Sequence, residues 1–586
     1  MCRILVIVLV LISSLSSTLY AQNRGVKTIS TEVADAALYL QEKVAPENRP
    51  YIRFFTTYAV PEELQEDTLL QLSFICHSLM GVASDETGNS GAYYPVAKFV
   101  WVDKEKRTYK IERLGAVTPT LHAIDLRYYN WTPQAWENVS KLDGYTVAPV
   151  IPDELYGYIR LLAGNAVVRA DWFIDAATNT TKQADLGIKN TIYRELLYAS
   201  NKVPTNVQEF QKIWGPANEE EAIAKGNNFL TLTVNSNIVA RHNRVLSGFR
   251  SDYGWSFRTY DVLSQTGKRD YFTNFFESKG KPPKIFDAGE LIAANSVQMQ
   301  VYDLINDKEQ IINDANAGVA RHTGDVLGDA RVRVANSCVD CHAAGPIPSE
   351  NAIKEFVKSK GQLNTYEYAD KLRIERAYLS DKFEDFVLDS QSQFARALLK
   401  VNGLTPEENV KSYLKVITWY NKPLDISQVV LETGLSEKEI EEKAGGKDLL
   451  MHQRRYVPPR LSLLLVNKNP IPREVWEVSR DGIPSAFQAT VLMIRGLTKT
   501  TTSYNTVTEK IVEKQVEKSV FINIIEGREN GAILFKKGTS QWFAPQIGTK
   551  YKYLGEEKNS QGKIWYKFEV DGNIGYVLPE ICKLEQ

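Results

Sequence analysis

The stretch Ser337-Cys338-Val339-Asp340-Cys341-His342 places two cysteines three residues apart, with a histidine directly after the second. The chain has 586 residues but only 5 Cys and 6 His, so this clustering is a specific feature. The pattern C-x-x-C-H is the attachment site of a c-type haem. Its two-residue gap lets both sulfur atoms add to the vinyl groups on one edge of the porphyrin, and the next residue presents an imidazole nitrogen to the iron.

We therefore predict one covalently attached haem c, with thioether bonds from Cys338 and Cys341 and with His342 as the proximal iron ligand. A zinc site would need two more ligands at metal spacing, and the chain has no second C-x-x-C and no H-x-x-x-H pair. A thioredoxin-like motif needs a βαβ context, which the flanking GDARVRVANS and AAGPIPSENA do not suggest. The single motif argues against a multihaem protein.

The sequence leaves the sixth iron ligand open. Met299, in NSVQMQVY, precedes the motif in the same region and is the first candidate. His322 and Met451 are further candidates, and a five-coordinate iron with no distal protein ligand is the remaining alternative. Each methionine also has an ordinary interpretation, because Met commonly fills irregular gaps in a core.

The first 21 residues, MCRILVIVLVLISSLSSTLYA, combine a basic residue, a short apolar run and a small residue at the end. This pattern predicts a secretory signal peptide (1–21) cleaved after Ala21, and an uncleaved membrane anchor is the alternative. No later segment is long and apolar enough to span a bilayer. We therefore expect an exported protein on the periplasmic or extracellular face, where haem attachment takes place.

Composition excludes several classes of protein. The formal net charge is −1, and a near-neutral charge argues against nucleic acid as a partner. The few cysteines exclude a disulfide scaffold, so we expect Cys76 and Cys582 to be free thiols. No Ser-His-Asp order, G-x-S-x-G or P-loop marks an independent catalytic site, which leaves open whether the chain is an enzyme.

Further motifs surround the haem motif in a fixed order. They are HAIDLRYYNWTPQAWENV (122–139), VVRADWFIDAA (167–177), ARHNRVLSGFRSDYGWSFRTYDV (240–262) and FDAGELIAANSVQMQVYDL (286–304), then WYNKPLDISQVVLETGLSEKEI (419–440) and NPIPREVWEVS (469–479). This order resembles a family of large bacterial monohaem cytochrome c-domain proteins, of planctomycete and myxobacterial type, over about residues 50–480. The resemblance implies haem binding and electron transfer. The chain departs from the family pattern at Phe286, where His often stands, and at Ala288, where Gly stands.

The acidic residues in these motifs have a structural interpretation. Asp125 with Arg127, and Asp171, are expected to form internal ion pairs or turns rather than an active site. In the region after the haem motif, Thr405 with Glu408 has the spacing of a helix capping box, as do Ser436 and Glu439.

The expected fold is multidomain. An α+β N-terminal region leads into a mainly helical cytochrome c-type haem region, and a small all-β SH3-like barrel follows. The expected segments are a loosely ordered N-terminus (22–50), an α+β domain (51–280), a haem-binding and helical region (281–480), a linker (497–518) and the barrel (519–586).

The C-terminal segment has short alternating strands, and Asp571-Gly572 between two of them predicts a hairpin. The pattern W-Y-K-F-x-V-D-G-x-I-G-Y-V resembles a bacterial SH3-like barrel, with Trp565, Tyr566 and Tyr576 as its aromatic core or binding face. This resemblance implies a docking module for a peptide or cell-wall ligand, and a passive end cap is the alternative.

Together these observations favour an exported monohaem c-type cytochrome that exchanges electrons with a redox partner protein. One alternative is a periplasmic oxidoreductase in which the haem accepts electrons from chemistry in the 50–300 region. The other is a five-coordinate haem that binds a small gas and is anchored by the SH3-like domain.

Overall fold

A computed structural model divides the chain into two compact units, residues 1–497 and 498–586. The structure describes residues 29–82, 98–103, 108–112, 116–141, 167–178, 191–216, 218–225, 227–233, 244–262, 281–315, 319–320, 332–349, 351–352, 354, 366–379, 381–444, 458–477 and 485–494 of the first unit, and 521–524, 534–535, 542–543, 550–558, 564–570, 573–577 and 582–585 of the second. The predicted signal peptide and linker lie outside these residues. No described helix has the length and apolar character needed to cross a membrane.

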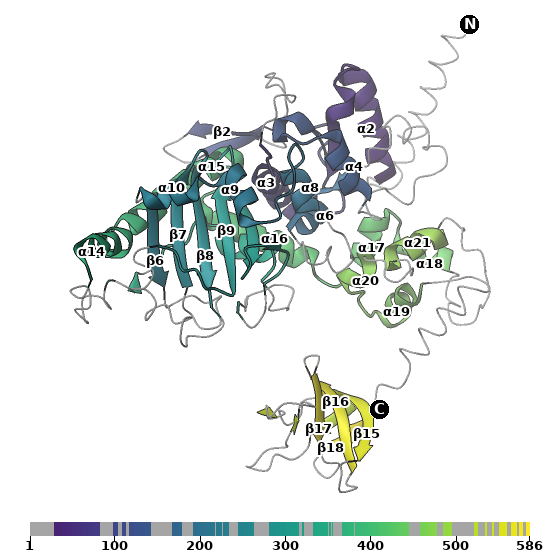
Figure 1. The fold of residues 1–586 in the computed structure, drawn as a ribbon. Coiled ribbons are helices and arrows are strands. Elements are labelled where there is room, and N and C mark those ends of the chain that lie inside the picture. The colour runs from purple at the N-terminus through teal and green to yellow at the C-terminus, as the bar shows by residue number, and fades with distance from the viewer. Residues whose placement is uncertain are drawn as a thin grey trace. The chain divides into compact units, whose positions relative to one another are not determined.

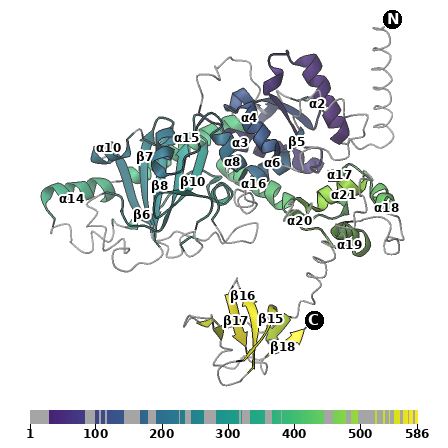
Figure 2. The same cartoon turned by 45° about the vertical axis from the view of Figure 1, so that its right-hand side comes forward.

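The first unit begins with helix α2 (Ile29–Lys43) on a three-stranded sheet of order β4-β1-β5 (Figure 2). Strand β1 (Ile52–Thr56) pairs antiparallel with β4 (Leu121–Asp125) and parallel with β5 (Val167–Arg169). Val33, Ala36, Ala37 and Leu40 of α2 are buried against one face of this sheet. Their helical spacing corrects the expectation of loose order for Ile29–Lys43, because such an apolar stripe is stabilised only when it is covered. The rest of the expected segment before Ile29 lies outside the described residues.

The opposite face of the small sheet, with Phe55, Ile124 and Val168, packs into the main core. The helices on this side include α3 (Glu62–Ser78), α4 (Pro133–Lys141) and α6 (Ala170–Thr178). The two faces of β1 therefore belong to two different apolar clusters, as the two-residue period of a strand requires.

The largest described sheet of the first unit has six strands in the order β11-β10-β9-β8-β7-β6 (Figure 1). Each strand pairs antiparallel with its neighbour in the chain. The strands are β6 (Asn228–Thr233), β7 (Arg244–Ser251), β8 (Gly254–Asp261), β9 (Ala288–Ala294), β10 (Gln300–Asn306) and β11 (Ile311–Ile312). The expected domain boundary at residue 280 falls inside this sheet, since β8 and β9 are paired neighbours.

Helix α15 (Lys382–Val401) covers one face of this sheet, which we call the α15 face. The ring of Phe386 stacks on Phe229 and contacts Phe257. A Cβ at Gly248 would lie 2.7 Å from the Phe386 ring, so glycine lets the helix approach the sheet closely. The other face contacts α8 (Ile192–Leu197), α9 (Val207–Trp214) and α10 (Glu219–Ala224), for example through the ion pair between Arg194 and Asp303 at 2.7 Å.

The region after the haem motif is helical as expected. It contains α14 (Tyr368–Ile374), α15, α16 (Pro406–Tyr420), α17 (Ile426–Thr433), α18 (Glu437–Ala444), α19 (Pro459–Asn467), α20 (Arg473–Glu477) and α21 (Ala486–Ile494). The capping box of Thr405 and Glu408 is confirmed, with both reciprocal hydrogen bonds formed at the start of α16. Ser436 and Glu439 make the same contacts before α18.

The expected ion pairs are also confirmed. Asp125 pairs with Arg127 at 2.7 Å, and Asp171 pairs with the buried Arg169. Arg169 also contacts Glu432 of α17 at 3.0 Å, and Glu432 accepts a hydrogen bond from Arg473 of α20 at 2.7 Å. This buried network connects β5 to the helical region.

The second unit contains an antiparallel sheet of order β17-β16-β15-β12-β18 and the separate pair β13 (Leu534–Phe535) and β14 (Trp542–Phe543). The five strands are β12 (Phe521–Ile524), β15 (Lys550–Lys558), β16 (Ile564–Val570), β17 (Asn573–Val577) and β18 (Cys582–Glu585). The hairpin at Asp571-Gly572 is confirmed, because Val570 and Asn573 are paired across it. Trp565 and Tyr566 lie in β16 and Tyr576 in β17, but the placement of their side chains is outside the description. The SH3-like barrel therefore stays a prediction.

Candidate haem-binding site

The C-x-x-C-H motif lies on the short helix α12 (Asn336–His342). Cys338, Cys341 and His342 are related by helical steps of three and four residues, so all three belong to one face of the helix. A covalent haem requires this arrangement, because both sulfur atoms and the imidazole must reach the same ring. All three cysteines whose side chains are described, including the expected Cys76, are free thiols.

Helix α12 lies in the interior of the first unit and is held from several sides. Gln300 of β10 donates from Nε2 to the carbonyl oxygen of His342 at 3.2 Å. Asn409 of α16 donates to the carbonyl oxygen of Ala343 at 3.3 Å. A Cβ on Gly345 would lie 2.8 Å from the ring of Phe394 in α15. These contacts fix the motif between the α15 face of the sheet and the helices beside it.

The two ring nitrogens of His342 have different surroundings. Nδ1 lies 3.4 Å from the carbonyl oxygen of Gly345. With Nδ1 donating to this carbonyl, the lone pair of Nε2 is available to bind a metal. Nε2 lies 4.0 Å from Oε1 of Glu290, which is beyond hydrogen-bond length. Burial lowers the pKa of His342, with Glu290 opposing the shift, and so favours the neutral imidazole that acts as a ligand.

The two thiols are also placed differently. Cys338 is buried, and its Sγ lies 3.9 Å from the carbonyl oxygen of Arg333. Burial raises the pKa of Cys338 well above its ordinary range, and the nearby Glu290 carboxylate adds to this shift. Cys341 is only half-buried. The motif therefore has one end in the core and one end nearer to solvent.

Glu290 belongs to a charged cluster on the α15 face of the sheet. Arg244 donates to both carboxylate oxygens of Asp261, at 2.8 and 2.7 Å, and to Oε2 of Glu290 at 3.3 Å. Strand alternation places Tyr302 on the same face as Glu290, and the Tyr302 ring centroid lies 6.3 Å from that of His342. We call Arg244, Asp261 and Glu290 the Glu290 cluster.

Met299, the first candidate for the distal ligand, is buried just before β10. Its backbone N–H donates to Oδ1 of Asn295 at 3.0 Å. Met299 lies in the turn that leads into β10, directly before Gln300, whose side chain contacts the end of α12. The other candidates, His322 and Met451, lie outside the described residues. All three remain predictions.

The other described histidine on a helix, His77 of α3, is engaged at both nitrogens. Nδ1 lies 2.7 Å from the carbonyl oxygen of Ser73, and Nε2 lies 3.3 Å from the hydroxyl of Tyr128. Its ring packs edge-on against Tyr128 and Tyr129. These contacts indicate a structural role.

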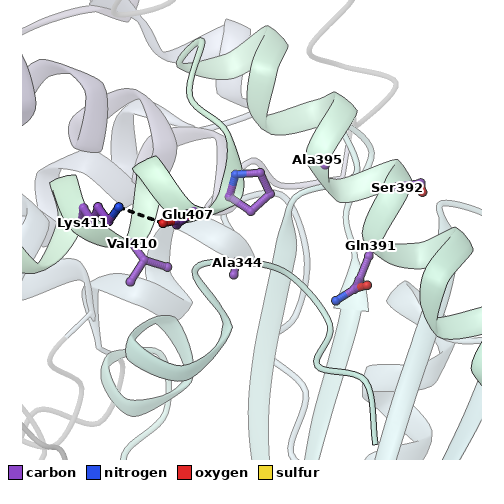
Figure 3. Close-up of a pocket in the computed structure, with 8 residues that line it drawn as sticks. Ala344, Gln391, Ser392, Ala395, Glu407, Val410 and Lys411 are labelled. Carbon is purple, nitrogen blue, oxygen red and sulfur yellow. Dashed lines mark hydrogen bonds and ion pairs between the residues drawn. The ribbon is translucent and has the colours of Figure 1, made fainter.

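A groove of about 550 Å³ opens where α12 ends, between α15 and α16 (Figure 3). Its lining is largely apolar around Ala344, Ala395 and Val410, and an ion pair of Glu407 and Lys411 at 2.8 Å lies on one side. The groove brings open space close to the C-terminal end of the haem motif. The lining residues are Ala344, Gln391, Ser392, Ala395, Pro406, Glu407, Val410 and Lys411.

Sequence reasoning identified the motif but missed the Glu290 cluster. Its members lie inside two of the motifs quoted above, residues 240–262 and 286–304, so the sequence already contained them as candidates. The signal was the alternation in β9 and β10, which puts Glu290 on the same face as Tyr302 once the strands are paired. The pairing itself cannot be read from one sequence.

The motif has the ligand chemistry that a covalent haem requires. The thiols of Cys338 and Cys341 form no disulfide, and together with the imidazole of His342 they belong to one face of α12. Comparison of the chain with protein-family models, with curated proteins and with solved structures found no match.

Proposed function

We propose that this protein is an exported monohaem c-type cytochrome that transfers electrons. The observation that carries the proposal is the geometry of α12, where Cys338, Cys341 and His342 share one face and Nδ1 of His342 lies against a backbone carbonyl. When bound, the haem supplies a one-electron couple between ferric and ferrous iron.

The residues of the chain have separate tasks in this proposal. Cys338 and Cys341 would hold the porphyrin covalently, and His342 would bind the iron through Nε2. The Gly345 carbonyl orients the imidazole ring, as partners of metal-bound histidines commonly do. The contacts of Gln300 and Asn409 with the end of α12 keep the motif rigid, which reduces rearrangement when the charge of the iron changes.

The second unit supports a docking function in the same proposal. It is all-β in its described residues, and its first strand β12 pairs with its last strand β18. An SH3-like module of this kind would hold the cytochrome near a peptide or cell-wall ligand, while the redox partner contacts the first unit.

The test is expression with a cytochrome c maturation system, followed by a pyridine haemochrome spectrum. The wild-type protein should give one c-type haem per chain, and the Cys338→Ala/Cys341→Ala variant should give none. Cys76→Ala is the matched control, because it removes a buried free thiol outside the motif and should keep the haem. Absence of covalent haem from the wild type would overturn the proposal.

Electron transfer is tested separately by spectroelectrochemistry. The attached haem should be reduced and reoxidised reversibly in a one-electron step. A haem that attaches but does not cycle would remove the electron-transfer part of the proposal and leave the haem site intact.

A further inference from the structure

The position of Glu290 relative to the haem motif has a chemical consequence. Oε1 of Glu290 lies 4.0 Å from Nε2 of His342, the nitrogen assigned to the iron. Glu290 is only 8% exposed, and no described residue donates a hydrogen bond to its Oε1. The Glu290 carboxylate therefore lies on the side of His342 where Nε2 would bind the iron.

The surrounding contacts hold Glu290 in place. Its backbone N–H donates to Oγ1 of Thr259 at 2.8 Å, and Arg244 donates to Oε2 at 3.3 Å. Arg244 itself is committed to Asp261 through two shorter hydrogen bonds of 2.8 and 2.7 Å. The Arg244 guanidinium therefore hydrogen-bonds both carboxylate oxygens of Asp261 but only one carboxylate oxygen of Glu290.

The formal charges of the Glu290 cluster also indicate that a positive group is expected beside Glu290. The Glu290 cluster contains one guanidinium and two carboxylates, so its formal charge is −1. An uncompensated charge is unfavourable in the interior of a protein. A ferric iron in a doubly deprotonated porphyrin has a net charge of +1, which matches the cluster. Ferrous haem has no net charge at its centre and would leave the cluster uncompensated.

We propose that Glu290, held by Arg244, is the charged residue on the iron-binding side of His342 and that it lowers the reduction potential of the haem. This inference rests on the proposed function, because it requires the haem to be attached. It deepens that function by assigning the control of the potential to a carboxylate on β9 instead of Met299.

The magnitude follows from burial. Interactions between charges are weakly screened in the interior of a protein, so one carboxylate near the iron has a much larger effect than a surface carboxylate. We expect Glu290→Gln, which keeps the shape and removes the charge, to favour ferrous over ferric haem by at least tenfold at a fixed potential. For a one-electron couple this is an upward shift of about 59 mV or more.

The experiment measures the midpoint potential and the visible spectrum of the full-length protein and its variants. Glu290→Asp keeps the charge and should shift the potential much less than Glu290→Gln. Met299→Ala should also leave the potential close to that of the wild type. Glu219→Gln is the matched control, because Glu219 is a largely buried carboxylate paired with Arg258 on the opposite face of the same sheet.

Haem content is measured first, so that a failure of the proposed haem binding can be distinguished from a failure of the proposed role of Glu290. A wild type without haem overturns the proposed function, and this inference with it. A wild type with haem in which Glu290→Gln and Glu219→Gln have equal effects overturns only the inference. A large change of potential or spectrum in Met299→Ala, with none in Glu290→Gln, would assign the distal side to Met299.

Discussion

Two buried histidines of this protein, His77 and His342, differ in what their second ring nitrogen faces. Both lie on helices, both have Nδ1 near a backbone carbonyl oxygen, and burial lowers the pKa of each. Nε2 of His77 meets the Tyr128 hydroxyl at 3.3 Å, whereas Nε2 of His342 faces a carboxylate at 4.0 Å. Both ring nitrogens of His77 therefore have a hydrogen-bond partner, whereas the carboxylate that faces Nε2 of His342 lies beyond hydrogen-bond length.

Two buried glutamates repeat this contrast. Glu432 accepts hydrogen bonds from Arg473 and from Nε1 of Trp476, both at 2.7 Å, and Arg169 lies 3.0 Å away. Glu290 has one donor to its carboxylate, Arg244 at 3.3 Å. The lesson is that burial alone does not mark a functional group, because the saturated groups are as buried as the open ones. What differs between these two glutamates is the number of hydrogen bonds to the carboxylate.

The largest effect on stability is expected for Glu432→Ala. The substitution leaves Arg169 and Arg473 buried without their shared carboxylate, and breaking a buried ion pair in this way costs about 3–5 kcal/mol of unfolding free energy. Haem content should not change, since no described hydrogen bond or ion pair links Glu432 to α12. Denaturant unfolding with a parallel haemochrome assay measures both.

Glu437→Ala is the control for this prediction. Glu437 forms an exposed ion pair with Lys468 at 3.1 Å, and such pairs contribute less than about 1 kcal/mol. Equal destabilisation by the two variants would show that the Glu432 network is not a saturated structural unit, and the contrast with Glu290 would lose its basis.

The next effect is a pH dependence that His77 contributes. Burial lowers the pKa of His77 from 6.5 to about 4. Between these values the unfolded chain takes up a proton that the folded protein excludes, so stability is lost as the pH falls from about 6.5 to 4. The full loss is about 3 kcal/mol. Unfolding curves across this pH range should show a smaller loss in His77→Gln than in the wild type, and identical slopes would contradict the assignment.

Local features of this fold could be predicted from the sequence. The capping box at Thr405 and the hairpin at Asp571-Gly572 depend on residues a few positions apart, and both are confirmed. The grouping of Cys338, Cys341 and His342 is local in the same way. Helix α2 is a local feature that was not predicted. Its apolar residues have helical spacing, but the segment also contains many polar residues, which favour a loosely ordered chain.

The distant contacts could not be predicted. Arg244 and Glu290 meet because β7, β8 and β9 pair side by side, and Arg169 meets Glu432 because α17 packs near β5. One sequence does not specify which strands pair or which helix covers which sheet. The domain boundary expected at residue 280 was misplaced relative to the sheet for this reason. The motif could therefore be found in advance, but the residues that face it could not.

A smaller effect is expected for Gly345→Ala, which changes the group that orients His342. Gly345 has φ +101°, which an alanine adopts only with strain, and the new Cβ would lie 2.8 Å from Phe394. We expect a loss of about 1–3 kcal/mol in stability together with a change in the midpoint potential, because the Gly345 carbonyl faces Nδ1 of His342.

Gly434→Ala is the matched control for Gly345→Ala. Gly434 ends α17 with φ 67°, so alanine there should cost about 1 kcal/mol. It should leave the potential unchanged, because Gly434 does not contact α12. A potential that shifts equally in both variants would show that it reports general loosening of the fold and not the orientation of the imidazole.

The smallest effect is expected for Tyr128→Phe, which removes the hydroxyl that faces Nε2 of His77. A hydrogen bond of 3.3 Å contributes about 1 kcal/mol, so unfolding curves should shift by that amount, and the exposed Tyr368→Phe should not shift them. The haem spectrum should stay the same in both. If Tyr128→Phe has no effect on stability, the hydrogen bond from Tyr128 to Nε2 of His77 does not stabilise the fold. The distinction between His77 and His342 must then rest on Cys338 and Cys341 alone. If the shift is found, the hydrogen-bond state of the second nitrogen separates the two histidines independently of the C-x-x-C-H motif.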